Sequence, residues 1–272
     1  MQKYVVGLGC SWTQGQGGYP QEIWNKYNGR INLSGGEDQH LRVYEHENSW
    51  VNLLCRNYLN DHIPINLGVR GCGNRGAVKQ LYFSNIDWSQ GSGYIILMLT
   101  GLDRFDFLRE DLLKPNNTYH HYKYNTIWPV ASSDNELWRG YAKAWSEQVV
   151  AHETMLAMLE LENFCKLYNY KLVIANGFNT VELDTHMDEY VSPLSKKFNW
   201  QSYLHSSTDY AAMIEKLIKL DNEINFKDWK DFYTKYEKFD YPKQYLTNCS
   251  HPTIEGYKII ANELYNFISL ST

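Results

Sequence analysis

The chain alternates short apolar runs with longer amphipathic segments, and this alternation constrains its fold more than any other feature. Four runs have the length and apolar content of strands, 3–9, 63–67, 94–99 and 171–175, and the run 94–99 is nearly continuous in apolar residues. A run without polar alternation is typical of a strand that is covered on both faces. Apolar residues at helical spacing predict helices over 48–60, from Asn74 onward, over 142–168 and from Pro252 onward.

Strands that alternate with helices pair in parallel and carry helices on both faces of the sheet. We therefore expect an α/β protein, a three-layer α/β/α sandwich built on a central parallel sheet. A length of 272 residues suffices for one such domain, and we predict that residues 1–272 form it. Three polar, irregular segments are expected to be insertions over the carboxyl edge of the sheet: 16–47, 103–140 and 177–247.

The composition excludes several classes of function. A formal net charge of -5 argues against nucleic acid as a partner, because nucleic-acid-binding surfaces are basic. No apolar run approaches the ~18 residues of a membrane span, and the first residues are too short in apolar length for a signal peptide. Five scattered cysteines without a C-x-x-C pair are typical of a reduced, intracellular protein. We expect a cytoplasmic location and no membrane partner, while the oligomeric state stays open.

Two residues that can carry chemistry stand at the predicted strand and helix ends. Ser11 comes directly after the first strand, and His251 comes directly before the last helix. Because the carboxyl ends of parallel strands meet along one edge of a sheet, we expect these residues to become neighbours. A hydroxyl beside an imidazole, with backbone N–H groups nearby, is the arrangement of a nucleophilic site. The sequence therefore predicts Ser11 as nucleophile and His251 as general base.

Four segments resemble, in their order, the four blocks of the SGNH (GDSL-type) hydrolase family: Gly9-Cys10-Ser11, Asn66-Leu67-Gly68-Val69-Arg70-Gly71, Gly101-Leu102-Asp103-Arg104 and Asn248-Cys249-Ser250-His251-Pro252. The resemblance implies an SGNH, flavodoxin-like sandwich that works without a cofactor. It implies an oxyanion hole made by the N–H groups of Ser11 and Gly71. It also implies a carboxylester substrate, often an acetyl group on a carbohydrate, which the 22 Tyr and 9 Trp of this chain would suit.

The chain departs from the family pattern at two positions. Asp103 stands where the third block usually has Asn, and an ionised carboxylate cannot donate a hydrogen bond to an oxyanion. Asn248 stands where the last block usually has Asp, so it can orient His251 but cannot stabilise an imidazolium by charge. Three arrangements remain open: a Ser–His dyad helped by a backbone carbonyl, an acid such as Asp240 or Asp103, or Asn248 as the orienting group.

Further residues near the predicted oxyanion hole are candidates for binding. Asn74 stands at a helix start, Arg70 could bind an anionic substrate group, and either Arg70 or Arg104 could pair with Asp103. Gly71-Cys72-Gly73-Asn74-Arg75-Gly76 matches G-x-G-x-x-G after a strand, but no acidic residue closes a second strand about 20 residues on, so we expect no dinucleotide. Two pairs could contribute to a metal site: His46 beside Glu45, and His120 beside His121. Neither pair has a third ligand at the spacing of a known metal motif, so we expect no metal.

The most favoured function is thus an atypical SGNH-type serine esterase or deacetylase. A ligand- or glycan-binding protein on a degenerate hydrolase scaffold is the main alternative, motivated by Asp103 and Asn248. An acyltransferase that uses the same Ser–His pair is another. The long, Tyr- and Asn-rich chain also looks similar to phage-encoded members of the family, which would favour association with a virion.

Overall fold

The structure is a computed structural model, and it describes residues 1–27, 41–102, 104–108, 124–127, 136–144, 146–177, 245–247 and 251–270. Its core is a sheet of four parallel strands in the order β2-β1-β3-β6, formed by Ile63–Asn66, Gln2–Leu8, Gly91–Leu99 and Tyr170–Asn176. The predicted strands are therefore confirmed, and all their carboxyl ends lie along one edge. A second, antiparallel sheet pairs β4 (Phe105–Leu108) with β5 (Tyr124–Ile127).

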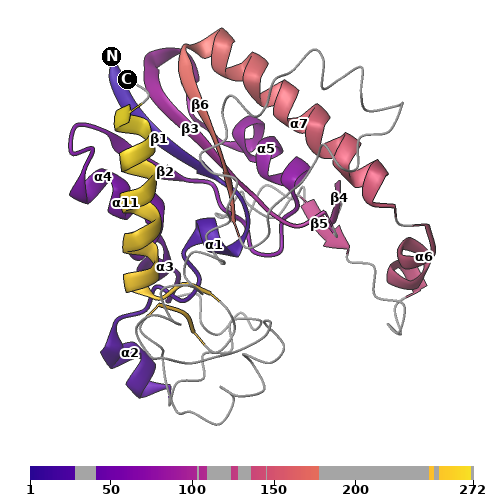
Figure 1. Cartoon of the computed structure of the whole chain (residues 1–272), viewed down its shortest axis with the longest axis horizontal. Helices are drawn as coiled ribbons and strands as arrows, with labels where there is room; N and C mark the ends of the chain where they lie inside the picture. Colours follow the sequence, from indigo (N-terminus) through magenta and orange to yellow (C-terminus); the bar gives the residue numbers. More distant parts are fainter. Residues whose placement is uncertain are drawn as a thin grey trace.

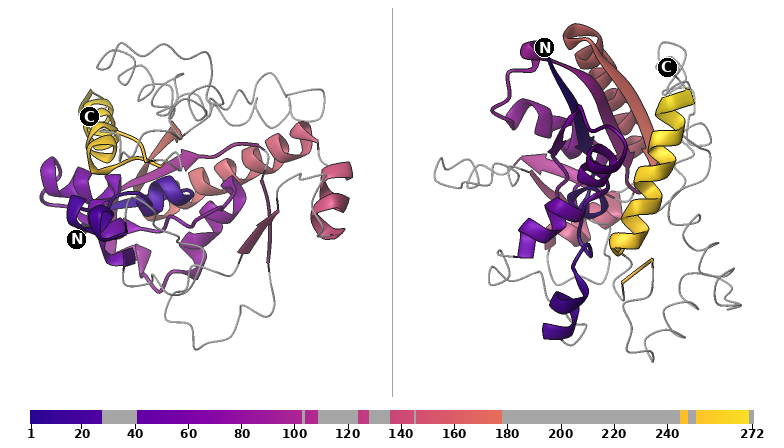
Figure 2. Two further views of the ribbon diagram at one scale, coloured as in Figure 1. Left: turned by 90° about the horizontal axis from the view of Figure 1, so that it is seen from below. Right: turned by 90° about the vertical axis from the view of Figure 1, so that its left-hand side faces the viewer.

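Helices cover both faces of the parallel sheet (Figure 1), which confirms the three-layer α/β/α architecture. Successive strand residues point to opposite faces and enter two separate cores. Val6, Ile95 and Leu97 pack beneath α5 (Asn74–Phe83) and α7 (Glu147–Tyr168). Val5, Ile96 and Met98 pack beneath α4 (Trp50–Asn57) and α11 (Ile254–Leu270). Figure 2 gives two further views of these layers.

Local signals explain several helix ends. Ser49 caps α4, as predicted, because its hydroxyl accepts a hydrogen bond from the N–H of Asn52 at 3.4 Å. The helix expected over 142–168 is divided into α6 (Glu136–Ala144) and α7, since Ser146 has an extended backbone and begins α7. The last helix begins at Ile254 rather than Pro252, because Pro252 forms an antiparallel bridge with Leu246.

Two of the predicted insertions contain regular structure. The first holds α2 (Gln21–Lys26) and α3 (Arg42–Asn48), and the second holds β4, β5 and the start of α6. Short elements complete the description: α1 (Ser11–Gln14) and the 3-10 helix η2 (Trp88–Gln90). The helical stretches expected near 208–220 and 226–238 lie outside the described residues. Among the described helices, none has the length and hydropathy that crossing a bilayer requires.

Candidate active site

Ser11 lies at a sharp turn between β1 and α1. The turn passes through Gly9, whose φ of 150° is unfavourable for other residues, and a Cβ there would lie 2.4 Å from the Thr13 Oγ1 and 2.9 Å from the Met98 carbonyl oxygen. Ser11 is the first residue of α1, so its N–H has no acceptor within the helix. The turn thus places the Ser11 hydroxyl and its own N–H at the carboxyl edge of the sheet.

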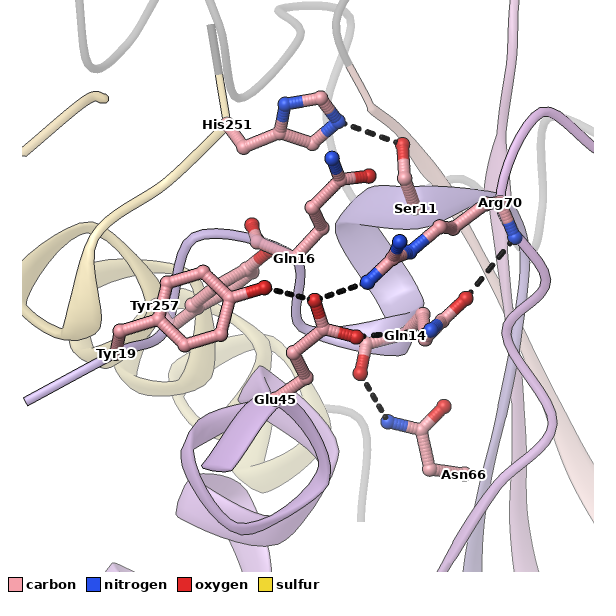
Figure 3. Close-up of polar contacts among 9 residues, drawn as sticks. All are labelled: Ser11, Gln14, Gln16, Tyr19, Glu45, Asn66, Arg70, His251 and Tyr257. Carbon is pink, nitrogen blue, oxygen red and sulfur yellow. Dashed lines mark hydrogen bonds and ion pairs between the residues drawn. The ribbon is translucent and has the colours of Figure 1, made fainter. Parts of the chain in front are cut away.

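His251 is presented to Ser11 by a short antiparallel turn that precedes α11. The Thr247 N–H donates to the His251 carbonyl oxygen at 2.8 Å, and the His251 N–H donates to the Thr247 hydroxyl at 3.1 Å. The imidazole Nε2 lies 2.8 Å from the Ser11 Oγ, across 240 positions of sequence (Figure 3). Ser11 is 7% exposed, and His251 is partly exposed. The structure therefore brings together the two residues predicted as nucleophile and base.

The loop after β2 runs directly against α1. The Asn66 side chain donates to the Thr13 carbonyl oxygen at 2.8 Å and accepts from the Gly68 N–H at 3.0 Å. A Cβ at Gly68 would lie 2.3 Å from the backbone nitrogen of Gln14, so only glycine permits this approach. Two segments that each carry a predicted oxyanion donor are thereby held in backbone contact.

Gly71 occupies a tight turn in this loop. The Cys72 N–H donates to the Val69 carbonyl oxygen at 3.1 Å, and Gly71 has a φ of 71°. Arg70 is not among the described residues with positive φ, so the turn is type II, which favours glycine at this position. Within the described part of the chain, the N–H groups of Ser11 and Gly71 donate to no protein acceptor. Both therefore meet a basic requirement for oxyanion donors.

The Arg70 side chain is engaged within the protein. Its guanidinium forms an ion pair with the fully buried carboxylate of Glu45 on α3, and the side chain is 17% exposed. Gln14 donates to the same carboxylate at 2.9 Å, and Tyr19 donates to it through its hydroxyl. A buried charge is stable only when it is paired in this way. In the sequence, Glu45 is notable only as the neighbour of His46 in a possible metal site.

Gln16 is a site residue that the sequence did not reveal. Figure 3 shows its side-chain amide pointing toward the Ser11–His251 pair. Its backbone is fixed, because its N–H donates to the Ser11 carbonyl oxygen at 3.0 Å and its carbonyl oxygen accepts from the buried Tyr257 hydroxyl at 2.8 Å. The amide itself makes no hydrogen bond within the described residues. No sequence pattern points to it, since a lone Gln in a glycine-rich loop is unremarkable.

Asn74 and Arg104 make contacts that shape the rim of the site. The Asn74 side chain accepts from the Thr100 N–H at 2.8 Å and donates to the Thr100 carbonyl oxygen at 3.2 Å, which ties the start of α5 to the end of β3. The Arg104 guanidinium donates to the Cys72 carbonyl oxygen at 3.1 Å. Both residues thus brace the loop that contains Gly71.

The amino end of α5 is occupied by a carboxylate from the same chain. Asp106 of β4 is buried and accepts from the N–H groups of Gly73 and Gly76, each at 2.8 Å. A Cβ at Gly73 would lie 2.5 Å from an oxygen of this carboxylate. The glycines of the G-x-G-x-x-G pattern therefore admit Asp106 to the position where a dinucleotide-binding protein holds phosphate.

Neither a reactive thiol nor a metal site is found among the described residues at this edge of the sheet. Burial raises the pKa of the Cys72 thiol well above its usual value, which keeps the thiol neutral and a poor nucleophile. No group of three metal-ligating side chains occurs among the described residues. Asp103, Asn248, Cys249, Asp240, His120 and His121 lie outside the described residues, so the predictions about them stay predictions.

Comparisons with known proteins add little. No family model matches the chain, and no curated protein matches it. Its computed structure is similar to a solved structure described as a "putative lipolytic protein of G-D-S-L family" from Desulfitobacterium hafniense DCB-2. The two share 14% identity with a TM-score of 0.46, over 98% of this chain and 99% of the other. A likeness this distant carries no argument about activity.

Proposed function

We propose that this chain is an SGNH-type serine hydrolase that cleaves a carboxylic ester, with Ser11 as nucleophile and His251 as general base. The observation that carries the proposal is the 2.8 Å separation of the Ser11 Oγ and the His251 Nε2. This separation is within the reach that proton transfer between a nucleophile and its base requires. The resemblance of the four strand-end segments to the SGNH blocks supports the choice of reaction.

The reaction follows from this arrangement. His251 takes the Ser11 proton as the oxygen attacks the ester carbonyl, and the oxyanion of the tetrahedral intermediate accepts from the N–H groups of Ser11 and Gly71. The imidazolium then returns its proton to the leaving alcohol, which leaves an acyl group on Ser11. His251 next activates a water molecule that hydrolyses the acyl-enzyme. We propose that Asn248 orients the imidazole, and that the substrate is an O-acetyl group on a carbohydrate.

The direct test is covalent labelling of the native protein with a fluorophosphonate probe. We expect one adduct per chain, located at Ser11 by peptide mass spectrometry, because a serine activated by a neighbouring base attacks phosphorus readily. Ser11→Ala should remove the adduct completely, whereas Ser89→Ala, which alters an exposed serine on η2, should leave it unchanged. A native protein that gains no adduct at Ser11 would instead favour a binding protein on this scaffold.

Gln16→Ala should lower kcat for ester hydrolysis by about 10-fold to 10²-fold with a smaller change in KM. The reason is that the Gln16 amide points toward the reacting pair, where a donor acts mainly on the transition state. Initial rates with p-nitrophenyl acetate over a range of concentrations would measure both constants. Gln21→Ala is the matched control, since Gln21 is exposed on α2 and its amide donates to Asn25. Equal rates for Gln16→Ala and the native protein would remove Gln16 from the site.

A further inference from the structure

The carboxylate of Glu45 stands at the centre of a buried network that joins both halves of the proposed oxyanion hole. It is fully buried, and it accepts from Gln14 on the helix that begins with Ser11 and from Arg70 in the turn that holds Gly71. Tyr19 is a third donor to it. Figure 3 shows these side chains converging on Glu45 below the Ser11–His251 pair. One group therefore contacts both segments that supply the N–H donors.

The network also controls the backbone at Arg70. The Gln14 side chain donates to Glu45 through its nitrogen, at 2.9 Å, and accepts from the Arg70 N–H through its oxygen, at 3.1 Å. Arg70 is thus held at its backbone by Gln14 and at its guanidinium by Glu45. These two contacts fix the residue that immediately precedes Gly71.

The orientation of the Gly71 N–H depends on this restraint. Type I and type II turns differ mainly in the orientation of their central peptide, which here joins Arg70 to Gly71. Glycine itself is free to adopt either form, so Gly71 does not select the direction of its own N–H. The contacts of the Arg70 N–H with Gln14 and of its guanidinium with Glu45 hold the residue on one side of this peptide, and they can make that selection.

We infer that Glu45 is the positioning residue of the oxyanion hole: its buried carboxylate holds Gln14 and Arg70 so that the Gly71 N–H keeps a fixed place relative to Ser11. This inference rests on the proposed function for its catalytic consequence, but its structural content stands alone. Glu45 contacts Gln14 and Arg70 rather than Ser11 or His251, so we assign it no contact with the substrate. It acts through Gln14 and Arg70, and it gives a positioning role to a segment, 41–48, that the sequence presents only as part of an insertion.

The decisive variant is Glu45→Gln, which keeps the shape of the side chain and removes its charge. Glu47→Gln is the matched control, because Glu47 lies on the same helix and is exposed. In Glu45→Gln we expect the Arg70 amide proton to exchange with solvent at least about tenfold faster by NMR, since Gln14 loses its anchor. We expect kcat to fall by about 10²-fold with KM little changed, because a displacement near 1 Å at the reacting groups has an effect of that size.

A merely structural role would give a different result, namely a lower melting temperature with the native kcat and native exchange at Arg70. That result would overturn the inference. Tyr19→Phe serves as a second variant if Glu45→Gln does not fold, because it removes one donor and keeps the ion pair; it should show the same changes at smaller size. If the native protein neither labels at Ser11 nor cleaves esters, the proposed function fails, while exchange at Arg70 still decides the positioning claim.

Discussion

Ser11→Ala and His251→Ala are each expected to lower kcat for p-nitrophenyl acetate by about 10⁴- to 10⁶-fold, and the double variant is expected to lose no more than either alone. The reason is that the two side chains act as one unit through the 2.8 Å contact, so removing one makes the other useless. Release of nitrophenolate under saturating substrate would measure all three variants against the native protein.

His62→Ala is the appropriate control for the histidine variant. His62 also lies 2.7 Å from a side-chain oxygen, that of Asp61, but it stands at the amino end of β2, away from the edge that holds Ser11. Its replacement should leave kcat unchanged. Losses that multiply in the double variant would show that Ser11 and His251 contribute separately, and the proposed mechanism would then be wrong.

Asp106→Ala should lower the free energy of unfolding by about 3 kcal/mol, because it leaves the buried N–H groups of Gly73 and Gly76 without acceptors. Asp106→Asn should lower the free energy of unfolding by less, because its amide oxygen can still accept a hydrogen bond from one of the two N–H groups. Urea unfolding followed by circular dichroism would measure both.

Asp87→Ala provides the comparison for this effect. Asp87 caps the 3-10 helix η2 with a carboxylate that also accepts an N–H, from Ser89 at 3.1 Å, but it is exposed to water. Its replacement by alanine should therefore lower the free energy of unfolding by only about 1 kcal/mol. If Asp106→Ala had as small an effect as Asp87→Ala, the carboxylate would not be the main support of the amino end of α5.

The parallel sheet could be predicted from the sequence because its strands are covered on both faces and carry their signal locally. Tyr94–Leu99, for example, is apolar throughout, and its alternate residues pack into two cores on opposite sides of the sheet. The division of the helix expected over 142–168 could not be predicted, since it depends on the extended backbone at Ser146. The antiparallel pairing of β4 and β5 was not predicted, because each strand is only four residues long and lies in a segment that is otherwise polar.

The Ser11–His251 pair could be predicted because, in a parallel α/β fold, the carboxyl ends of strands and the amino ends of helices share one edge, whatever the length of chain between them. Glu45 and Asp106 could not, since each is a single acidic residue whose role depends on burial against a distant segment. Gly73 and Gly76 indicate that some group approaches the amino end of α5 closely, but a bound phosphate and a buried carboxylate would require the same glycines. The missing acidic residue after a second strand argued against a dinucleotide, but only the three-dimensional contacts identify Asp106 as the occupant.

The separation of the nucleophile and its base along the chain has a consequence for biosynthesis. During translation, a ribosome adds His251 only after it has added the 239 residues that follow Ser11. The position of the base also depends on α11, because His251 lies just before this helix, whose Tyr257, Ile260 and Leu264 are buried in the core beside α4. Under the proposed mechanism, the Ser11 hydroxyl therefore has no base while residues 12–250 are being made, and its activation must wait for α11 to dock.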